Sequence, residues 1–427
     1  MMMAFPQLAS IGTVVSLLGC CASLGAQSAK PAPTESANSW QAAATLTEGI
    51  NTNVLMSFQN PKADATSLLQ LDLGRRWSGP HWSFQATYTP QAVNYERNRG
   101  LDYISHSYTQ AWQAALSPRI RLGWTLSYDH YPERAGAPSA GGGLAAVTGA
   151  SQAMAVQSIL AGVNSNFSLS DQYSLRGSWT AGASVTVQRF SPDIRLLRAL
   201  PGNTPVPPVT DTRSGGGNLG WSWKLTPERS LEISATDNEL WFTNPAQRMR
   251  YADVQANLIQ QFGPDIALQA GIGPAWNQIL KTVTTAQQLP GQSYAANASL
   301  TTQQGGTVYG ISWQHTEQAG LVPGGVATDN VALDYGVGWG RGFHAQGSIG
   351  EGHFTGLGAD TVGTTRPASQ DSLFVSGQFD WRLGSAWSLS AQTVWSAQGL
   401  PVSLTTVGEL RRLQASVGIT YAPVGAH

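Results

Sequence analysis

The chain has 427 residues, of which only 11% are Asp, Glu, Lys or Arg, whereas an ordinary soluble protein carries about 25%. Its 24 basic and 25 acidic residues give a formal net charge of -1, which excludes a nucleic-acid binder that works through bulk positive charge. The mean hydropathy of -0.15 is too polar for a bundle of membrane helices. Two or three soluble domains or one large closed sheet remain compatible with this length and composition.

The N-terminal segment is the one stretch that resembles a membrane helix. Residues 11–26 are apolar or small, and no charged side chain precedes Lys30. This length and the small residues up to Ala26 predict a secretory signal peptide over 1–26. Residues 27–39 are rich in Ser, Ala and Pro and predict a periplasmic linker.

Both cysteines, Cys20 and Cys21, fall within the predicted signal. Cleavage near its end therefore leaves a mature chain without a disulfide or a thiolate metal site. The residues before Cys20 also resemble the bacterial lipoprotein box, whose cysteine is lipidated. The type of signal peptidase stays open between these two alternatives.

From Trp40 onward the hydrophobic pattern has a period of two. Residues 82–89, 173–187 and 413–421 alternate apolar and polar side chains, so each predicted strand has one apolar and one polar face. The core of a two-layer sandwich also alternates, but it seldom uses Gly, Ala and Trp this heavily.

Short turn sequences recur along the chain, and longer polar connections such as 134–153 and 190–213 lie between them. This alternation is typical of an outer-membrane barrel with its tight turns on the periplasmic side. Eight tight turns and one further strand at each end predict an all-β, transmembrane, antiparallel up-and-down β-barrel of about 18 strands over 40–427. Sixteen strands is the alternative, because 40–58 and 271–304 are less regular. The tight turns are expected at Ser78-Gly79-Pro80, Ser117-Pro118, Ser170-Asp171, Thr226-Pro227-Glu228, Gly263-Pro264-Asp265, Gln304-Gly305-Gly306, Arg341-Gly342 and Gly384-Ser385.

Aromatic residues cluster beside these turns and predict a girdle at the membrane interface. The alternative is that each ring only packs a sheet. The candidate girdle residues are Trp77, Trp82, Tyr173, Trp223, Phe343, Trp381, Trp387 and Tyr421.

A barrel of 18 strands is wide enough for an aqueous lumen, and alternation assigns charges of both signs to its inner wall. One interpretation is a water-filled wall with opposite charges on neighbouring strands; the other is a basic track for an anionic polymer. The best constriction candidate is the proline-rich segment 190–213 with its arginines, and the alternative is a solvated extracellular loop. The lumen and constriction candidates are Arg76, Arg121, Arg176, Arg189, Arg195, Arg198, Lys224, Glu232, Arg382 and Arg412, with Asp72, Asp334 and Asp380 as further inward carboxylates.

Nothing in the sequence indicates catalysis or a cofactor. Residues 215–220 fit GxGxxG, but no strand–helix unit surrounds them, and the seven histidines are scattered without metal-ligand spacing. We therefore expect neither an enzyme nor a metal, and no nucleic-acid partner.

A family resemblance rests on the first hairpins: residues 49–55, the polar loop 60–64, the segment 88–95, Asp102-Tyr103 and the turn 116–119. In these the chain resembles the beta-barrel porin type 2 family, outer-membrane barrels often associated with bacterial exopolysaccharide systems. The resemblance implies an outer-membrane channel of a Gram-negative bacterium that passes exopolysaccharide or another polar solute. Outer-membrane lipid and the outer-membrane assembly machinery are the other expected partners. A general diffusion porin and a closed-lumen structural or enzymatic barrel remain as alternatives.

Overall fold

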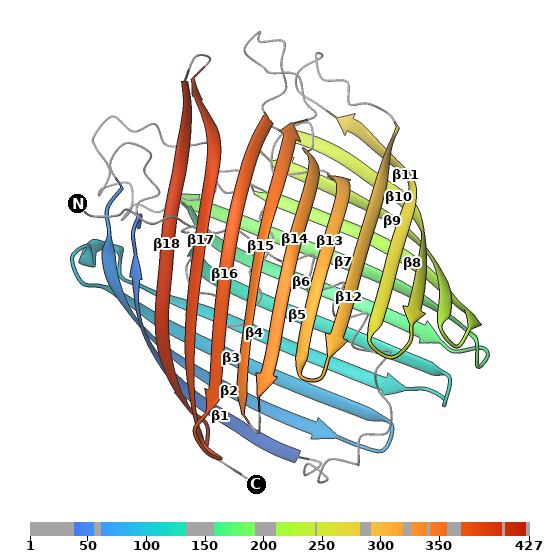
Figure 1. The fold of residues 1–427 in the computed structure, drawn as a ribbon, viewed down its shortest axis with the longest axis horizontal. Helices are drawn as coiled ribbons and strands as arrows, with labels where there is room; N and C mark the ends of the chain where they lie inside the picture. The colour runs from blue at the N-terminus through green and yellow to red at the C-terminus, as the bar shows by residue number, and fades with distance from the viewer. Residues whose placement is uncertain are drawn as a thin grey trace.

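The protein is a closed transmembrane β-barrel (Figure 1). The computed structural model describes residues 38–54, 61–133, 158–192, 211–243, 246–281, 292–318, 326–339, 342–356, 369–403 and 406–423. Within these ranges 18 antiparallel strands each pair with their neighbours in sequence, and β1 pairs with β18 to complete the ring. The predicted fold class and strand number are thus confirmed. The predicted signal peptide lies outside the described residues, and Asn38 and Ser39 of the predicted linker already belong to β1.

The strands are long, and the walls of the barrel cross at an angle in Figure 1 because the strands tilt. Ordinary strand spacing and tilt give 18 strands a diameter of roughly 35 Å between opposite backbones. The region 271–304, expected to be irregular, contributes β11 and β12 to the ring. The strands are β1 (Asn38–Asn51), β2 (Asp64–Ser78), β3 (Trp82–Tyr95), β4 (Tyr103–Ala115), β5 (Ile120–Glu133), β6 (Ser158–Asp171), β7 (Gly177–Pro192), β8 (Thr212–Thr226), β9 (Arg229–Thr243), β10 (Ala246–Phe262), β11 (Ile266–Lys281), β12 (Ser293–Gln304), β13 (Thr307–Gln318), β14 (Val326–Trp339), β15 (Phe343–Gly356), β16 (Ser369–Arg382), β17 (Trp387–Ser403) and β18 (Thr406–Tyr421).

The short connections expected from the sequence lie at one end of the barrel, called the turn end below, and each joins the predicted pair of strands. The turn expected at Ser170-Asp171 is displaced, because both residues still belong to β6 and the connection to β7 follows at 172–176. Arg341, in another expected turn, lies outside the described residues. Local chemistry explains their positions. Gly263 and Gly305 take positive φ angles of 69° and 60°, which other residues adopt at a cost. The hydroxyl of Ser117 accepts a hydrogen bond from the backbone N–H of Ile120 at 3.0 Å, and that of Ser174 accepts one from Gly177 at 2.8 Å.

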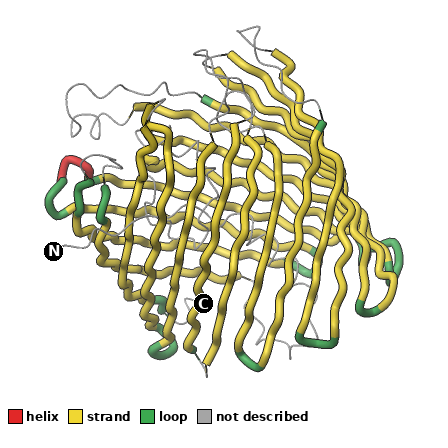
Figure 2. The backbone as a smooth tube through the Cα atoms, turned by 45° about the horizontal axis from the view of Figure 1, so that its top comes forward, coloured by secondary structure: helices red, strands yellow, loops and turns green. Residues whose placement is uncertain are grey.

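The other ends of the strands lie at the opposite end of the barrel, called the loop end, together with the connections there that the structure describes. These connections include one turn of 3-10 helix, Arg99–Leu101, shown in red in Figure 2. The expected alternation of short turns with long loops is wrong at two places, because only two residues separate β9 from β10 and β17 from β18. At these places the strands are long instead, and β10 and β17 each reach 17 residues.

The outer face of the barrel is apolar. Large side chains such as Leu46, Ile104, Ile272 and Val417 are exposed along the strands, and so much exposed apolar surface marks contact with lipid. Between the aromatic rim at the turn end and a polar belt nearer the loops, the outward positions of the described strands carry no Asp, Glu, Lys or Arg. No helix in the described ranges is long and apolar enough to cross a membrane.

The candidate girdle residues lie beside the tight turns. Trp77, Trp82, Trp223, Phe343, Trp381, Trp387 and Tyr421 occupy outward strand positions, and Tyr173 lies in the turn before β7. The rings pack on one another, as Trp387 does against Tyr421 with centroids 4.7 Å apart. The Arg75 guanidinium lies over the Trp40 ring at 4.4 Å and the Trp77 ring at 4.5 Å, an arrangement that suits the headgroup level.

Candidate functional site

The inner face of the barrel is the candidate site, and strand alternation determines which side chains line it. On β3, Trp82 and Tyr88 face outward, so the positions between them, such as Gln85 and Thr87, face the lumen. Residues that are paired in the register face the same side of the sheet, so the assignment extends to the neighbouring strands. Ser, Thr, Gln, Asn and Gly fill most inner positions of the described strands.

Most of the predicted lumen charges occupy inner positions. Those that do are Arg76, Arg121, Lys224, Glu232, Arg382, Arg412, Asp72, Asp334 and Asp380. Arg76, Arg121, Lys224 and Arg382 lie at the turn end, no more than two residues from the ends of β2, β5, β8 and β16. Further along the wall toward the loops, carboxylates such as Asp72, Asp129 and Asp253 outnumber the cations.

Four predicted candidates do not line the described wall. Arg176 lies in the tight turn before β7 rather than on a strand. Because β7 continues to Pro192, Arg189 is part of the strand and not of a loop. It alternates in phase with the outward Val185, so its side chain is exposed on the outer face. Arg195 and Arg198 lie outside the described residues, as does most of the segment expected to constrict the lumen.

The inner carboxylates accept hydrogen bonds from neutral donors. Asp380 accepts a hydrogen bond from the amide of Gln378 at 2.8 Å, and Glu232 accepts one from the hydroxyl of Ser222. Lys224 lies opposite Ser230 in the register and is therefore a diagonal neighbour of Glu232. Hydrogen bonds of this kind satisfy a carboxylate without placing a cation in the lumen.

One ladder of side-chain hydrogen bonds crosses β2, β3 and β4. Asp72 accepts from the amide of Gln70 at 2.8 Å and from the hydroxyl of Thr89 at 2.8 Å. Gln70 accepts from Gln91 at 3.2 Å, and Gln91 accepts from Ser105 at 3.3 Å. The ladder holds the amides in place while leaving part of their donor and acceptor capacity toward the lumen.

A second ladder crosses β10, β11 and β12. Asp253 accepts from Gln255 at 2.8 Å, and the amide of Asn297 donates to Gln255 at 3.2 Å and to Asn257 at 3.0 Å. The strand between them carries Gly271, where an added Cβ would overlap the side-chain oxygen of Asn257. The missing side chain therefore lets amides from the two flanking strands meet across β11.

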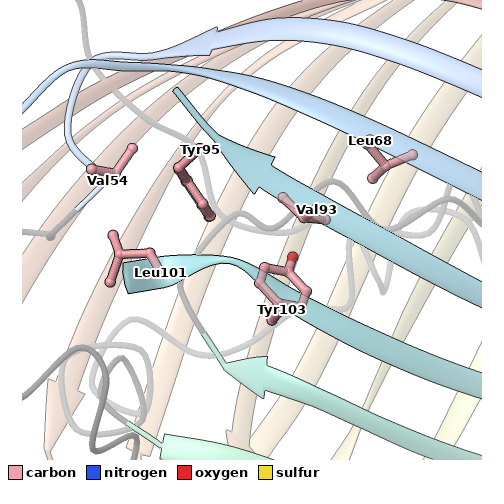
Figure 3. Close-up of a cluster of buried hydrophobic side chains, with 6 residues drawn as sticks. All are labelled: Val54, Leu68, Val93, Tyr95, Leu101 and Tyr103. Atoms are coloured by element: carbon pink, nitrogen blue, oxygen red, sulfur yellow. The ribbon is translucent and has the colours of Figure 1, made fainter. Parts of the chain in front are cut away.

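An apolar cluster lines the inside of the wall at the loop end (Figure 3). The loops after β1 and β3 bring Val54 and Leu101 against inward residues of β2 to β4, and the cluster comprises Val54, Leu68, Val93, Tyr95, Leu101 and Tyr103. Arg412 of β18 lies close by and is only 2% exposed. Its guanidinium donates to the side-chain oxygen of Asn51 at 2.8 Å, which ties β18 to the end of β1 where the ring closes.

Sequence reasoning missed the residues that the register assembles on the outer face near the loop end. His315, Asp329, His353 and Asp371 lie directly opposite one another on four consecutive strands. The His315 and Asp329 side chains are 2.9 Å apart, and those of His353 and Asp371 are 2.5 Å apart. In the described part of the chain no group of three His, Cys, Asp or Glu side chains could hold a metal ion. Only an alignment of predicted strands by their tight turns could have found this row.

Comparison with known proteins matches the chain to neither a family model nor a curated protein. Solved structures that are similar include OccAB4 from Acinetobacter baumannii, with 11% identity, a TM-score of 0.46 and coverage of 91% of this chain and 99% of that one. OpdL from Pseudomonas aeruginosa gives 11% identity, a TM-score of 0.47 and coverage of 90% and 98%. The siderophore receptor PirA from Pseudomonas aeruginosa is 8% identical, with a TM-score of 0.44 and coverage of 92% of this chain and 81% of that one. Likeness at this level carries no conclusion about cargo.

Proposed function

We propose that the protein is a passive channel in the outer membrane of a Gram-negative bacterium and that its lumen passes polar solutes. The observation that carries the proposal is the inner wall, where amide and hydroxyl ladders replace the apolar packing of a filled core. A ring of 18 strands has room for an aqueous lumen once its side chains are accommodated. The apolar outer face supports the membrane location.

The cargo we propose is a neutral polysaccharide or a similar hydroxyl-rich solute. Amide side chains such as Gln91 and Asn297 offer both donors and acceptors to sugar hydroxyls. The resemblance to the beta-barrel porin type 2 family points the same way, since it implies exopolysaccharide. The inner carboxylates repel a polyanion, whereas a neutral polymer meets no such repulsion.

A general diffusion porin is the second candidate. The observation that favours it is the spread of the inner charges, since Arg76, Arg121, Lys224 and Arg382 lie on four strands around the ring instead of gathering at one place. Such a wall suits small solutes of many kinds as well as one polymer.

Two experiments test these readings. Folded, purified protein should form conducting pores in a planar bilayer, and an absence of conductance would reject the channel and favour a closed-lumen barrel. Deletion of the gene should lower the secreted polysaccharide. Unchanged polymer secretion together with slower uptake of small sugars would reject the polysaccharide and favour the diffusion porin.

A further inference from the structure

A row of arginine and tryptophan side chains lies on the outer face at the loop end. Arg213 of β8, Trp241 of β9 and Arg248 of β10 stand directly opposite one another in the register. All three alternate in phase with the exposed apolar residues Leu219, Ile233 and Leu258 of the same strands. They therefore face the surroundings of the barrel, beyond the uncharged band that contacts lipid tails.

Two side chains of this row, Trp241 and Arg248, are held in place. The Arg248 guanidinium lies 5.8 Å from the centroid of the Trp241 ring and forms an ion pair with Glu239. The Trp241 ring lies over Gly215, where an added Cβ would meet it at 3.6 Å. The ring thus covers the sheet at Gly215.

Two further arginines extend the row into a sector over β7 to β10. Arg250 binds both carboxylate oxygens of Asp237, at 2.8 Å and 2.6 Å, while its side chain stays half exposed. Arg189 is exposed on the outward face of β7. The sector, called the arginine sector below, therefore holds four arginines and two carboxylates and is net positive.

The opposite charge prevails at the same level on β13 to β16. Asp329, Glu351 and Asp371 face outward there, together with His315 and His353. The belt thus holds a basic sector on β7 to β10 and an acidic sector on β13 to β16. A uniform belt would be expected if these charges only kept the loop end in water.

We propose that the arginine sector binds the phosphate groups of lipid A in the outer leaflet. This rests on the proposed outer-membrane location, in which the loop end faces the cell exterior. Guanidinium groups match phosphate oxygens in pairs, and an indole ring between them packs on the adjoining sugar or acyl chain at the interface. Asp237 and Glu239 position the arginines while leaving the sector positive, so the site is preorganised for an anion.

The test measures lipid A retained by the full, folded chain in detergent. Diphosphorylated lipid A is the probe, and native mass spectrometry counts bound molecules on the wild type and on an R213Q/R248Q variant. We expect retention to fall by about tenfold or more in the variant, because two charged contacts are lost. Monophosphorylated lipid A should bind the wild type more weakly. The matched control is R411Q, which removes an exposed outward arginine of β18 far from the sector.

Three outcomes would overturn the proposal. Equal retention by the double variant and the wild type would show that the sector is not the site. Equal retention of phosphatidylglycerol would show a general anionic surface instead of a lipid A site. If the wild type forms a complex of two copies, and the double variant loses this complex but retains as much lipid A as the wild type, then the basic sector of one copy binds the acidic sector of another. A wild type that retains lipid A but conducts no ions would reject the channel alone and leave the lipid site standing.

Discussion

Neutralising the cations at the turn end of the lumen gives the sharpest test of the inner wall. The perturbation replaces Arg76, Arg121, Lys224 and Arg382 together by Gln. All four face inward near the tight turns, on β2, β5, β8 and β16. Glutamine keeps a polar side chain of similar length, so the wall should lose charge with little change in packing.

The magnitude follows from the inner charges of the described strands. Among the inner side chains that the structure describes there are five cations, the four above and Arg412. The carboxylates number seven, namely Asp64, Asp72, Asp129, Glu232, Asp253, Asp334 and Asp380. The wild-type wall is therefore mildly negative, and the variant leaves one cation against the same carboxylates. With side chains in place the lumen has a half-width of about 10 Å, which equals the Debye length near 0.1 M salt. The electrostatic potential of the charges on the wall therefore extends to the axis of the lumen.

The assay is the reversal potential of single channels in a planar bilayer under a tenfold KCl gradient centred near about 0.1 M. The wild type should prefer cations weakly. The reversal potential of the variant should shift from the wild-type value by tens of millivolts, toward the limit of about 59 mV for a channel that passes only cations. In about 1 M salt the difference should vanish, because the Debye length falls to about 3 Å. An R189Q/R411Q variant, altered only on the outer face, should match the wild type. Identical reversal potentials for the wild type and the quadruple variant at low salt would refute the assignment of these four residues to the lumen.

Further predictions concern the stability of the wall and are measured by urea unfolding of the folded protein in lipid vesicles. Gly271→Val should lower the free energy of unfolding by about 1–3 kcal/mol, since its side chain overlaps Asn257; Gly384→Val, in a tight turn with open space around it, is the control. Arg412→Met should cost about 1–3 kcal/mol, because Asn51 loses a buried charged donor, and an unchanged midpoint would contradict the role of this contact in ring closure. Asp72→Ala should cost about 1–3 kcal/mol through its lost hydrogen bonds, with Asp72→Asn intermediate.

The architecture could be predicted from the sequence because local chemistry encodes it. A period of two assigns the two faces of a strand without knowledge of its partners, and turn residues such as Gly263 and Gly305 mark the ends of hairpins by their positive φ angles. The mistake at Arg189 has a local cause as well. The prolines that follow it were taken to begin a loop at Phe190, whereas the alternation of Val185, Val187 and Arg189 continues the strand.

The clusters on the outer face could not be predicted, because they depend on register between strands. Arg213 and Trp241 are 28 positions apart in the sequence and directly opposite in the sheet. A slip of one residue would place one of them in the lumen. Counting residues from a tight turn gives the register of its two strands, but an irregular turn shifts that register by a residue. The shift between Lys224 and Thr226 is of this kind.

The inner wall argues for weak binding along the whole lumen instead of one tight site. Its amides already bond to one another, as in the ladder from Asp72 to Ser105, so a passing hydroxyl must compete with contacts that the wall makes in its absence. Conduction needs binding that is favourable enough for entry and weak enough for release, and a wall of amides that are partly bonded to one another meets both demands. Because the carboxylates beyond the turn end exceed the cations, a neutral chain meets a lower barrier than a polyanion. Polysaccharides that differ only in uronic acid content should therefore pass at different rates, the neutral polymer faster, and equal rates in low salt would contradict this account of the lumen.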